Sequence, residues 1–164
     1  MSIELASGNL DLAIDVPLPP DPQIKQKPLS SHPYVCVVRN DNELVGDSLD
    51  LDTYLKLKHI HISSRRGGLG LVDLALGKMG KKREIILRTQ NYLATPQMAA
   101  TTNFAITVPR IFAEFLSRTA DVRLLELPFE APALEAFLYW HESTDKDQAN
   151  IWIREMISST YNSS

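Results

Sequence analysis

The stretch His59-Ile60-His61-Ile62-Ser63-Ser64-Arg65-Arg66-Gly67-Gly68-Leu69-Gly70-Leu71-Val72-Asp73 decides the fold of this chain. An apolar, alternating run stops at two serines, a basic glycine-rich turn follows, and a helix begins near Leu69. In α/β proteins, the loops at the carboxyl ends of strands build the mouth of a ligand site. The stretch therefore predicts a βα unit with a small-ligand site directly after its strand.

The chain on either side continues this alternation of strands and helices. Predicted strands cover residues 10–14, 34–39, 59–63, 84–88, 104–108, 122–127 and 136–140, and predicted helices cover residues 51–57, 69–79, 92–100, 110–117 and 149–161. Tyr34 to Arg39 is nearly all apolar, which is typical of a strand buried on both faces. The pattern predicts an α/β fold with a mainly parallel sheet. Two proline-rich segments, Pro17–Pro22 and Pro128–Pro132, are typical of connections, and if both pass between lobes the chain forms two lobes around a cleft.

Composition excludes several classes of protein. The 164 residues carry a net charge of −3, which argues against a protein that binds mainly the phosphate backbone of nucleic acid. The one cysteine, Cys36, cannot form an internal disulfide and lies in an apolar strand pattern, so we expect a buried, inert thiol in a reducing compartment. No apolar stretch approaches the roughly 18 residues of a membrane span, and the amino terminus lacks the pattern of a secretory signal. We expect a cytoplasmic protein without membrane contact.

Two motifs have competing interpretations. Gly68 to Asp73 imitates a dinucleotide fingerprint, but the third glycine is replaced by Asp73 and no acid follows the next strand, so no cofactor is predicted. We favour a ligand loop whose helix start can hold a carboxylate or phosphate. His59 and His61 share one face of a strand and could share a metal, but no further ligand has suitable spacing. Structural or ligand-contacting histidines, and no metal, are the preferred interpretation.

The remaining candidates have simpler interpretations. Basic residues near the end of the helix after the glycine-rich turn complement its dipole and are expected to remain solvated: Lys78, Lys81, Lys82 and Arg83. Tyr139 to His141 is interpreted as a core edge packed under the last helix, with a ligand wall as the alternative. The sequence holds no nucleophile elbow and no recognisable catalytic set, so we expect no enzyme and no catalytic residues.

Six stretches, in order, resemble one family. They are Leu5–Ile14, Pro28–Leu29 with Tyr34–Arg39, His59–Asp73, Asn103–Arg110, Leu138–His141 and Trp152–Arg154. Together they resemble the effector-binding domain of LysR-type transcriptional regulators, in the branch of nodulation and aromatic-catabolism regulators. The resemblance implies a periplasmic-binding-protein-like (type 2), two-lobed α/β fold. It also implies that the winged helix-turn-helix and the opening of the first lobe are absent, so that the first lobe is incomplete and this chain makes no direct contact with nucleic acid.

The resemblance assigns parts and a site. It implies residues 1–32 as the remainder of the first lobe, 33–130 as the second lobe, and 131–164 as the return strand and final helix of the first lobe. A small-molecule effector, a carboxylate and in this branch often an aromatic one, would bind in the cleft and control transcription. The implied contacts are Asp15, His59, Ser63, Asn91 and Tyr92. Full-length family members form homo-oligomers.

Three alternatives stay open. The first is a solute-binding protein of the same fold, and the second is a small α/β enzyme. The third is a non-functional remnant, because an incomplete first lobe would leave the strand at residues 10–14 without neighbours and prone to aggregation.

Overall fold

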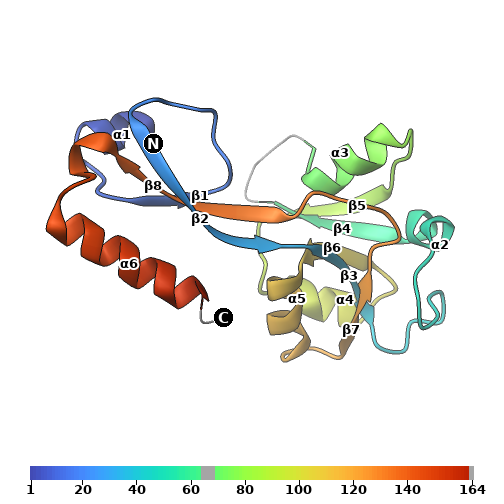
Figure 1. Ribbon diagram of the computed structural model, residues 1–164. Coiled ribbons are helices and arrows are strands. Elements are labelled where there is room, and N and C mark those ends of the chain that lie inside the picture. The colour runs from blue at the N-terminus through green and yellow to red at the C-terminus, as the bar shows by residue number, and fades with distance from the viewer. Residues whose placement is uncertain (64–68, 163–164) are drawn as a thin grey trace. The chain divides into compact units, whose positions relative to one another are not determined.

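The computed structural model of the chain describes residues 1–63 and 69–162 (Figure 1). The chain divides into two compact units. Unit 1 is made of Met1–Ser31 and Leu134–Ser164, and unit 2 is the continuous segment His32–Ala133. The chain therefore leaves unit 1 after Ser31 and returns after Ala133. Pro17–Pro22 lies wholly inside unit 1, so the condition that both proline-rich segments pass between lobes is not met.

Unit 2 is built on a five-stranded sheet of order β5-β4-β6-β3-β7. Its strands are β3 (Tyr34–Arg39), β4 (Lys58–Ile62), β5 (Glu84–Thr89), β6 (Ala105–Pro109) and β7 (Val122–Glu126). β4 is parallel to both β5 and β6, whereas β3 is antiparallel to both β6 and β7. The sheet is thus mixed: β4, β5, β6 and β7 share one direction and β3 opposes them, so the prediction of a mainly parallel sheet fails only at β3. β3 arrives directly from unit 1 rather than through a covering helix, so no βαβ crossover sets its direction.

Helices cover both faces of this sheet. α2 (Leu51–Lys56) and α3 (Leu71–Lys78) pack on one face, and α4 (Thr95–Ala100) and α5 (Arg110–Ser117) pack on the other (Figure 1). β3 contributes side chains to the core on both faces of the sheet. Cys36 and Val38 pack on the α2 and α3 side, and Val35 and Val37 pack on the α4 and α5 side. All four side chains are fully buried, so the prediction of a buried strand is confirmed.

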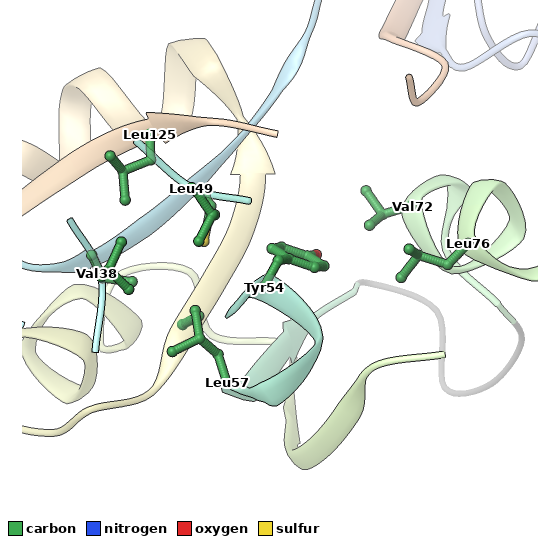
Figure 2. Close-up of a cluster of buried hydrophobic side chains, with 10 residues drawn as sticks. Val38, Leu49, Tyr54, Leu57, Val72, Leu76 and Leu125 are labelled. Carbon is green, nitrogen blue, oxygen red and sulfur yellow. The ribbon is translucent and has the colours of Figure 1, made fainter. Parts of the chain in front are cut away.

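The core on the α2 and α3 side is centred on an aromatic residue. Figure 2 shows the side chain of Tyr54, from α2, between Leu57 and the two α3 residues Val72 and Leu76. Its ring also meets Phe129 edge-on, with 5.3 Å between the ring centroids. Tyr54 is fully buried, so its hydroxyl needs a partner inside the protein, and the site described below supplies one.

Unit 1 is smaller and carries a three-stranded sheet of order β1-β8-β2. It contains α1 (Ser2–Ala6), β1 (Ala13–Asp15), β2 (Ile24–His32), β8 (Leu134–His141), the 3-10 turn η1 (Glu142–Thr144) and α6 (Gln148–Asn162). β1 runs antiparallel to β8, with Ile14 opposite Leu138. The expectation that the strand at residues 10–14 has no neighbour is therefore wrong, although β1 is an edge strand of the described sheet.

Arg154 connects the last helix, α6, to the segment around β8 in unit 1. The Arg154 guanidinium lies over the Trp140 ring, 4.2 Å from its centroid, and its Nη2 donates to the Asp145 carbonyl oxygen at 2.8 Å. Trp140 Nε1 donates to the Asp145 carboxylate at 2.8 Å. Trp140 therefore packs under the final helix, as expected from the sequence. Within the described residues, no helix has the length and apolar character needed to cross a membrane.

Candidate functional site

Three of the predicted site residues lie at the carboxyl edge of the parallel strands in unit 2. Ile62 is in register with Thr89, and the next residue, Ser63, donates its backbone N–H to the Thr89 carbonyl oxygen at 3.0 Å. Because β4 and β5 run in parallel, their carboxyl ends bring Ser63 next to the segment that contains Asn91. This edge of the sheet, formed by Ser63 and Thr89 to Tyr92, is called the effector edge below.

Asn91 shapes the turn that leads into α4. Its backbone N–H donates to Thr89 Oγ1 at 3.0 Å, and its side-chain Oδ1 accepts from the N–H groups of Leu93 and Ala94 at 3.0 and 3.1 Å. These bonds form an Asx turn that satisfies amide groups at the start of the helix. They use only the oxygen of the side-chain amide, so the two Nδ2 hydrogens keep their capacity to bind an acceptor on a ligand. The Asn91 side chain is exposed.

An aromatic group adjoins Asn91. The half-buried Tyr92 ring lies 5.2 Å from the Phe112 ring, and burial raises the pKa of the Tyr92 hydroxyl. Burial also raises the pKa of Tyr34, with a smaller contribution from the nearby Tyr92. Tyr34 begins β3 opposite Pro109, the last residue of β6, which places it at the same edge of the sheet. Sequence reasoning missed Tyr34 and Phe112, because the antiparallel direction of β3 is what brings Tyr34 to this edge.

His59 lies at the other end of β4. Ser63 lies four positions further along the chain, or about 13 Å along a strand. Its side chain is fully buried, and its Nε2 is 2.9 Å from the Tyr54 carbonyl oxygen, which can only accept, so Nε2 carries the proton. His59 Nδ1 has no hydrogen-bond partner within the part of the chain that the structure describes, and burial lowers the pKa of His59 to about 4. His59 is therefore a neutral core residue that satisfies a carbonyl near the end of α2, and its contact with an effector stays a prediction.

Asp15 belongs to unit 1, whereas the effector edge belongs to unit 2. It ends β1 with an exposed side chain, and its Oδ1 accepts from the Val16 N–H at 2.8 Å. The following segment is held by the buried Tyr139, whose hydroxyl donates to the Val16 carbonyl oxygen and accepts from the Leu18 N–H, each at 3.1 Å. Asp15 has an ordered local environment, and its role in binding stays a prediction.

A buried polar cluster lies on the α2 and α3 side of β4. Arg83 donates from Nε and Nη2 to both Asp73 carboxylate oxygens at 2.8 and 3.1 Å, and from Nη1 to the Tyr54 hydroxyl at 3.3 Å. Its Nη2 also lies 3.3 Å from His61 Nδ1, and the Tyr54 hydroxyl lies 2.8 Å from Thr107 Oγ1. Arg83 is only 7% exposed, so the prediction that it is solvated is wrong, although Lys78, Lys81 and Lys82 are exposed. The bidentate pair with Asp73 explains how a guanidinium is tolerated there.

The glycine-rich turn is described only from Leu69 onward. Arg65 to Gly68 lie outside the described residues, so the predicted anion-holding loop is not described. Gly70 is the N-cap of α3, and a Cβ added there would lie 3.0 Å from His61 Cε1. The glycine is thus explained by the close packing of the helix start on the His61 ring.

The metal-site and cysteine candidates from the sequence can also be compared with the structure. Among the described residues, no group of three or more His, Cys, Asp or Glu side chains could hold a metal ion. Cys36 is fully buried, and burial raises the pKa of its thiol to about 12, as expected of an inert core cysteine.

Two α/β units, the larger with helices on both faces of an open sheet, define the class of this protein: a periplasmic-binding-protein-like fold of type 2. The family model described as the LysR substrate binding domain matches residues 2–161, and the chain belongs to this family. The family resemblance in the sequence motifs is thereby confirmed.

Curated relatives with similar sequences are regulators. The chain is 27% identical over 153 residues to the HTH-type transcriptional activator NahR of Pseudomonas putida. The aligned region covers 93% of this chain and 51% of that protein. It is 27% identical over 127 residues to nodulation protein D 2 of Rhizobium tropici. That aligned region covers 76% of this chain and 40% of that protein. The chain thus spans about half or less of the length of these relatives.

Solved structures of regulatory and effector-binding domains have the same fold as this chain. The regulatory domain of MexT, a transcriptional activator in Pseudomonas aeruginosa, superposes with a TM-score of 0.82 at 28% identity, over 96% of this chain and 76% of that chain. The effector binding domain of QuiR, solved in complex with shikimate, shares the fold with a TM-score of 0.76 at 19% identity, over 99% of this chain and 77% of that chain.

Proposed function

We propose that this chain is the effector-sensing part of a bacterial LysR-type transcriptional regulator and that it binds a small carboxylate, without catalysing a reaction. The observation that carries the proposal is the meeting of Ser63, Asn91 and Tyr92 at the carboxyl edge of parallel strands. Open α/β sheets bind their ligands at this edge. Membership of the LysR substrate-binding family supports the regulatory role.

The chemistry of the effector edge suits an acid with an apolar or aromatic body. The Asn91 amide can donate hydrogen bonds to carboxylate oxygens, and the half-buried Tyr92 ring offers an apolar wall. Contacts from His59 and from Asp15 belong to the proposal as well. Because His59 is fully buried, such a contact would require the α2 end of β4 to open.

The regulator as a whole would act in the cytoplasm as a homo-oligomer. DNA binding would belong to a part of the regulator outside this sequence, and the net charge of −3 suits a domain that does not itself bind DNA. An effector could change transcription only by binding one conformation of the regulator more tightly than another.

Thermal melting of the purified chain tests the proposal. The panel is benzoate, 4-hydroxybenzoate, phenylacetate, shikimate and succinate. At a concentration one hundred times its Kd, a binding acid stabilises the folded chain by about 2.7 kcal/mol, which for a chain of this size raises Tm by roughly 5–10 °C. If the chain melts cooperatively and no acid in a broad carboxylate screen raises its Tm, the proposal is wrong.

A matched pair of variants locates the binding. Asn91→Asp keeps the capping oxygen of the Asx turn but places a negative charge where the carboxylate is expected, so the ligand-induced rise in Tm should vanish. Asn103→Asp adds the same charge before the amino end of β6, at the opposite edge of the sheet, and should leave the rise intact. Equal responses of the two variants would place the ligand elsewhere.

A further inference from the structure

The buried polar cluster connects β4 with α2 and α3. Arg83 is joined to α3 through Asp73, to α2 through Tyr54 and to β4 through His61. His61 lies two residues before Ser63 in the sequence. The amino end of α3 is packed on the same ring, since a Cβ on Gly70 would lie 3.0 Å from His61 Cε1. The carboxyl end of β4 and the start of α3 are therefore both held at His61.

The geometry fixes the protonation state of His61. A guanidinium can only donate hydrogen bonds, so the 3.3 Å contact from Arg83 Nη2 requires an unprotonated Nδ1 on His61. Protonation of Nδ1 would remove this bond and place a second cation beside a buried one. Among the described residues, the titratable and charged side chains that face His61 or its two partners are Asp73 of α3, Tyr54 of α2, Arg83, Arg88 of β5, His59 of β4, and Tyr34 and Cys36 of β3.

Asp73 is the one group among these that would favour a charged His61. Its Oδ2 lies 3.7 Å from His61 Nδ1, but both carboxylate oxygens already accept from Arg83. The two arginines oppose the charge, and burial opposes it more strongly still, so the pKa of His61 is lowered. The closed cluster therefore requires a neutral His61.

We propose that His61, Arg83 and Asp73 are positioning residues for effector binding: while His61 is neutral they hold the end of β4 against the start of α3, and protonation of His61 releases both, so that effector binding weakens as the pH falls. The functional meaning of this inference rests on the proposed function. The link between His61 and the two segments is testable without any effector.

Linkage gives the direction and size of the effect. In the released state His61 titrates as an ordinary histidine, with a pKa near 6.5, whereas the closed cluster takes up its proton at a lower pH. Below about pH 6.5 the released state gains population by up to tenfold per pH unit, until the pKa of the closed cluster is reached. Above this pH the cluster is fully formed.

Amide hydrogen exchange of the full chain, followed by NMR between pH 8 and pH 5, measures this release. Two amides report on it: the Ser63 N–H, bonded to the Thr89 carbonyl oxygen, and the Leu74 N–H, bonded to the Gly70 carbonyl oxygen. After correction for intrinsic exchange rates, protection of both should fall by up to tenfold per pH unit below about 6.5, relative to the amides of β3. In His61→Asn the amide oxygen can replace Nδ1 as acceptor and does not titrate, so the pH dependence should disappear. If His61→Asn keeps it, the proposal is wrong.

A second pair of variants separates positioning from general stability. Arg83→Lys keeps the charge but loses the bidentate fork, so protection of Ser63 and Leu74 should fall at pH 8 while that of β3 is retained. Arg154→Lys makes the same change at an arginine-aspartate pair in unit 1 and should leave both reporters unchanged. Equal loss of protection throughout unit 2 in Arg83→Lys would show a purely structural role. If Arg83→Lys does not fold, His61→Asn still decides the question.

The two proposals can fail separately. A carboxylate that binds with the same affinity at pH 8 and pH 5.5 would contradict the positioning role and leave the proposed function intact. A carboxylate screen without a binder would contradict the proposed function, whereas the exchange experiment would stand on its own result.

Discussion

His59 shows how one buried side chain couples stability to pH. Its Nε2 donates to the Tyr54 carbonyl oxygen, near the carboxyl end of α2, and its ring centroid lies 4.6 Å from that of Tyr54. Burial lowers its pKa from the ordinary 6.5 to about 4. Above pH 6.5 the folded and unfolded chains both hold His59 neutral. As the pH falls from 6.5 to 4, only the unfolded chain takes up the proton, so stability is lost over this interval.

Urea unfolding of wild-type and His59→Gln chains, at several values between pH 7.5 and pH 4, measures this loss. The shift in pKa corresponds to roughly 3 kcal/mol of unfolding free energy. Glutamine can keep a donor near the position of Nε2 but does not titrate, so its curve should fall by about 3 kcal/mol less over this range. Because both chains share every other titratable group, the difference between the two curves isolates His59. Parallel curves would show that His59 is protonated in the folded chain.

For single residues, the sequence predicts which side chains lie at the ligand-binding edge of the sheet better than it predicts which side chains form ion pairs. Ser63, Asn91 and Tyr92 follow predicted parallel strands, and the rule that ligands bind at carboxyl ends brings them together. Arg83 follows Lys81 and Lys82 and looks equally solvated in the sequence. What distinguishes it is Asp73, ten residues earlier on the face of α3 that turns inward, and only the packing of the helix on the sheet reveals this.

Helix α3 contains two glycines whose roles are opposite. A Cβ on Gly70, at the N-cap, would lie 3.0 Å from His61 Cε1, whereas a Cβ on Gly77, near the other end, meets nothing within 4 Å. Alanine at position 77 reduces the conformational entropy of the unfolded chain at no steric cost and should stabilise the protein by about 0.5–1 kcal/mol. Alanine at position 70 should destabilise it by about 1–3 kcal/mol, the usual cost of overpacking. Urea midpoints of the two variants test this, and a neutral Gly70→Ala would mean that α3 is not seated on His61.

At the scale of elements, strands with apolar repeats were predictable and strands with polar ones were not. β3, β4 and β5 have nearly the predicted bounds, because the apolar side chains of residues 35–38 and of Ile60 and Ile62 are buried and Leu87 of β5 packs on the same core. β2 was not predicted, because Lys25, Gln26, Lys27 and Pro28 look like a loop in the sequence. All four are exposed, and the strand is specified by its pairing in the sheet next to β8. Pairing partners distant in sequence also fix the direction of β3, which no local pattern encodes.

At the scale of the whole molecule, the two units differ in how the chain builds them. Unit 2 is one continuous segment with two apolar core clusters, one on each face of its sheet. Unit 1 is assembled from the two ends of the chain, and its described core cluster is small: Leu29, Leu138 and Trp140. Forming unit 1 requires closure of a long loop in return for little buried apolar surface, so unit 1 should be the less stable of the two.

The chain carries one reporter group for each unit, so this difference can be measured in a single urea titration. Both tryptophans lie in unit 1, where Trp140 is 9% exposed and Trp152 63%, so the change in fluorescence on unfolding comes mainly from Trp140. The one cysteine, Cys36, is fully buried in unit 2 and becomes reactive only when that core opens. We expect Trp140 fluorescence to change at a lower urea concentration than Cys36 alkylation. Arg154→Lys should move only the fluorescence transition, because its partners Trp140 and Asp145 both belong to unit 1. If the fluorescence and alkylation midpoints coincide in both the wild-type protein and Arg154→Lys, the two units unfold as one cooperative structure.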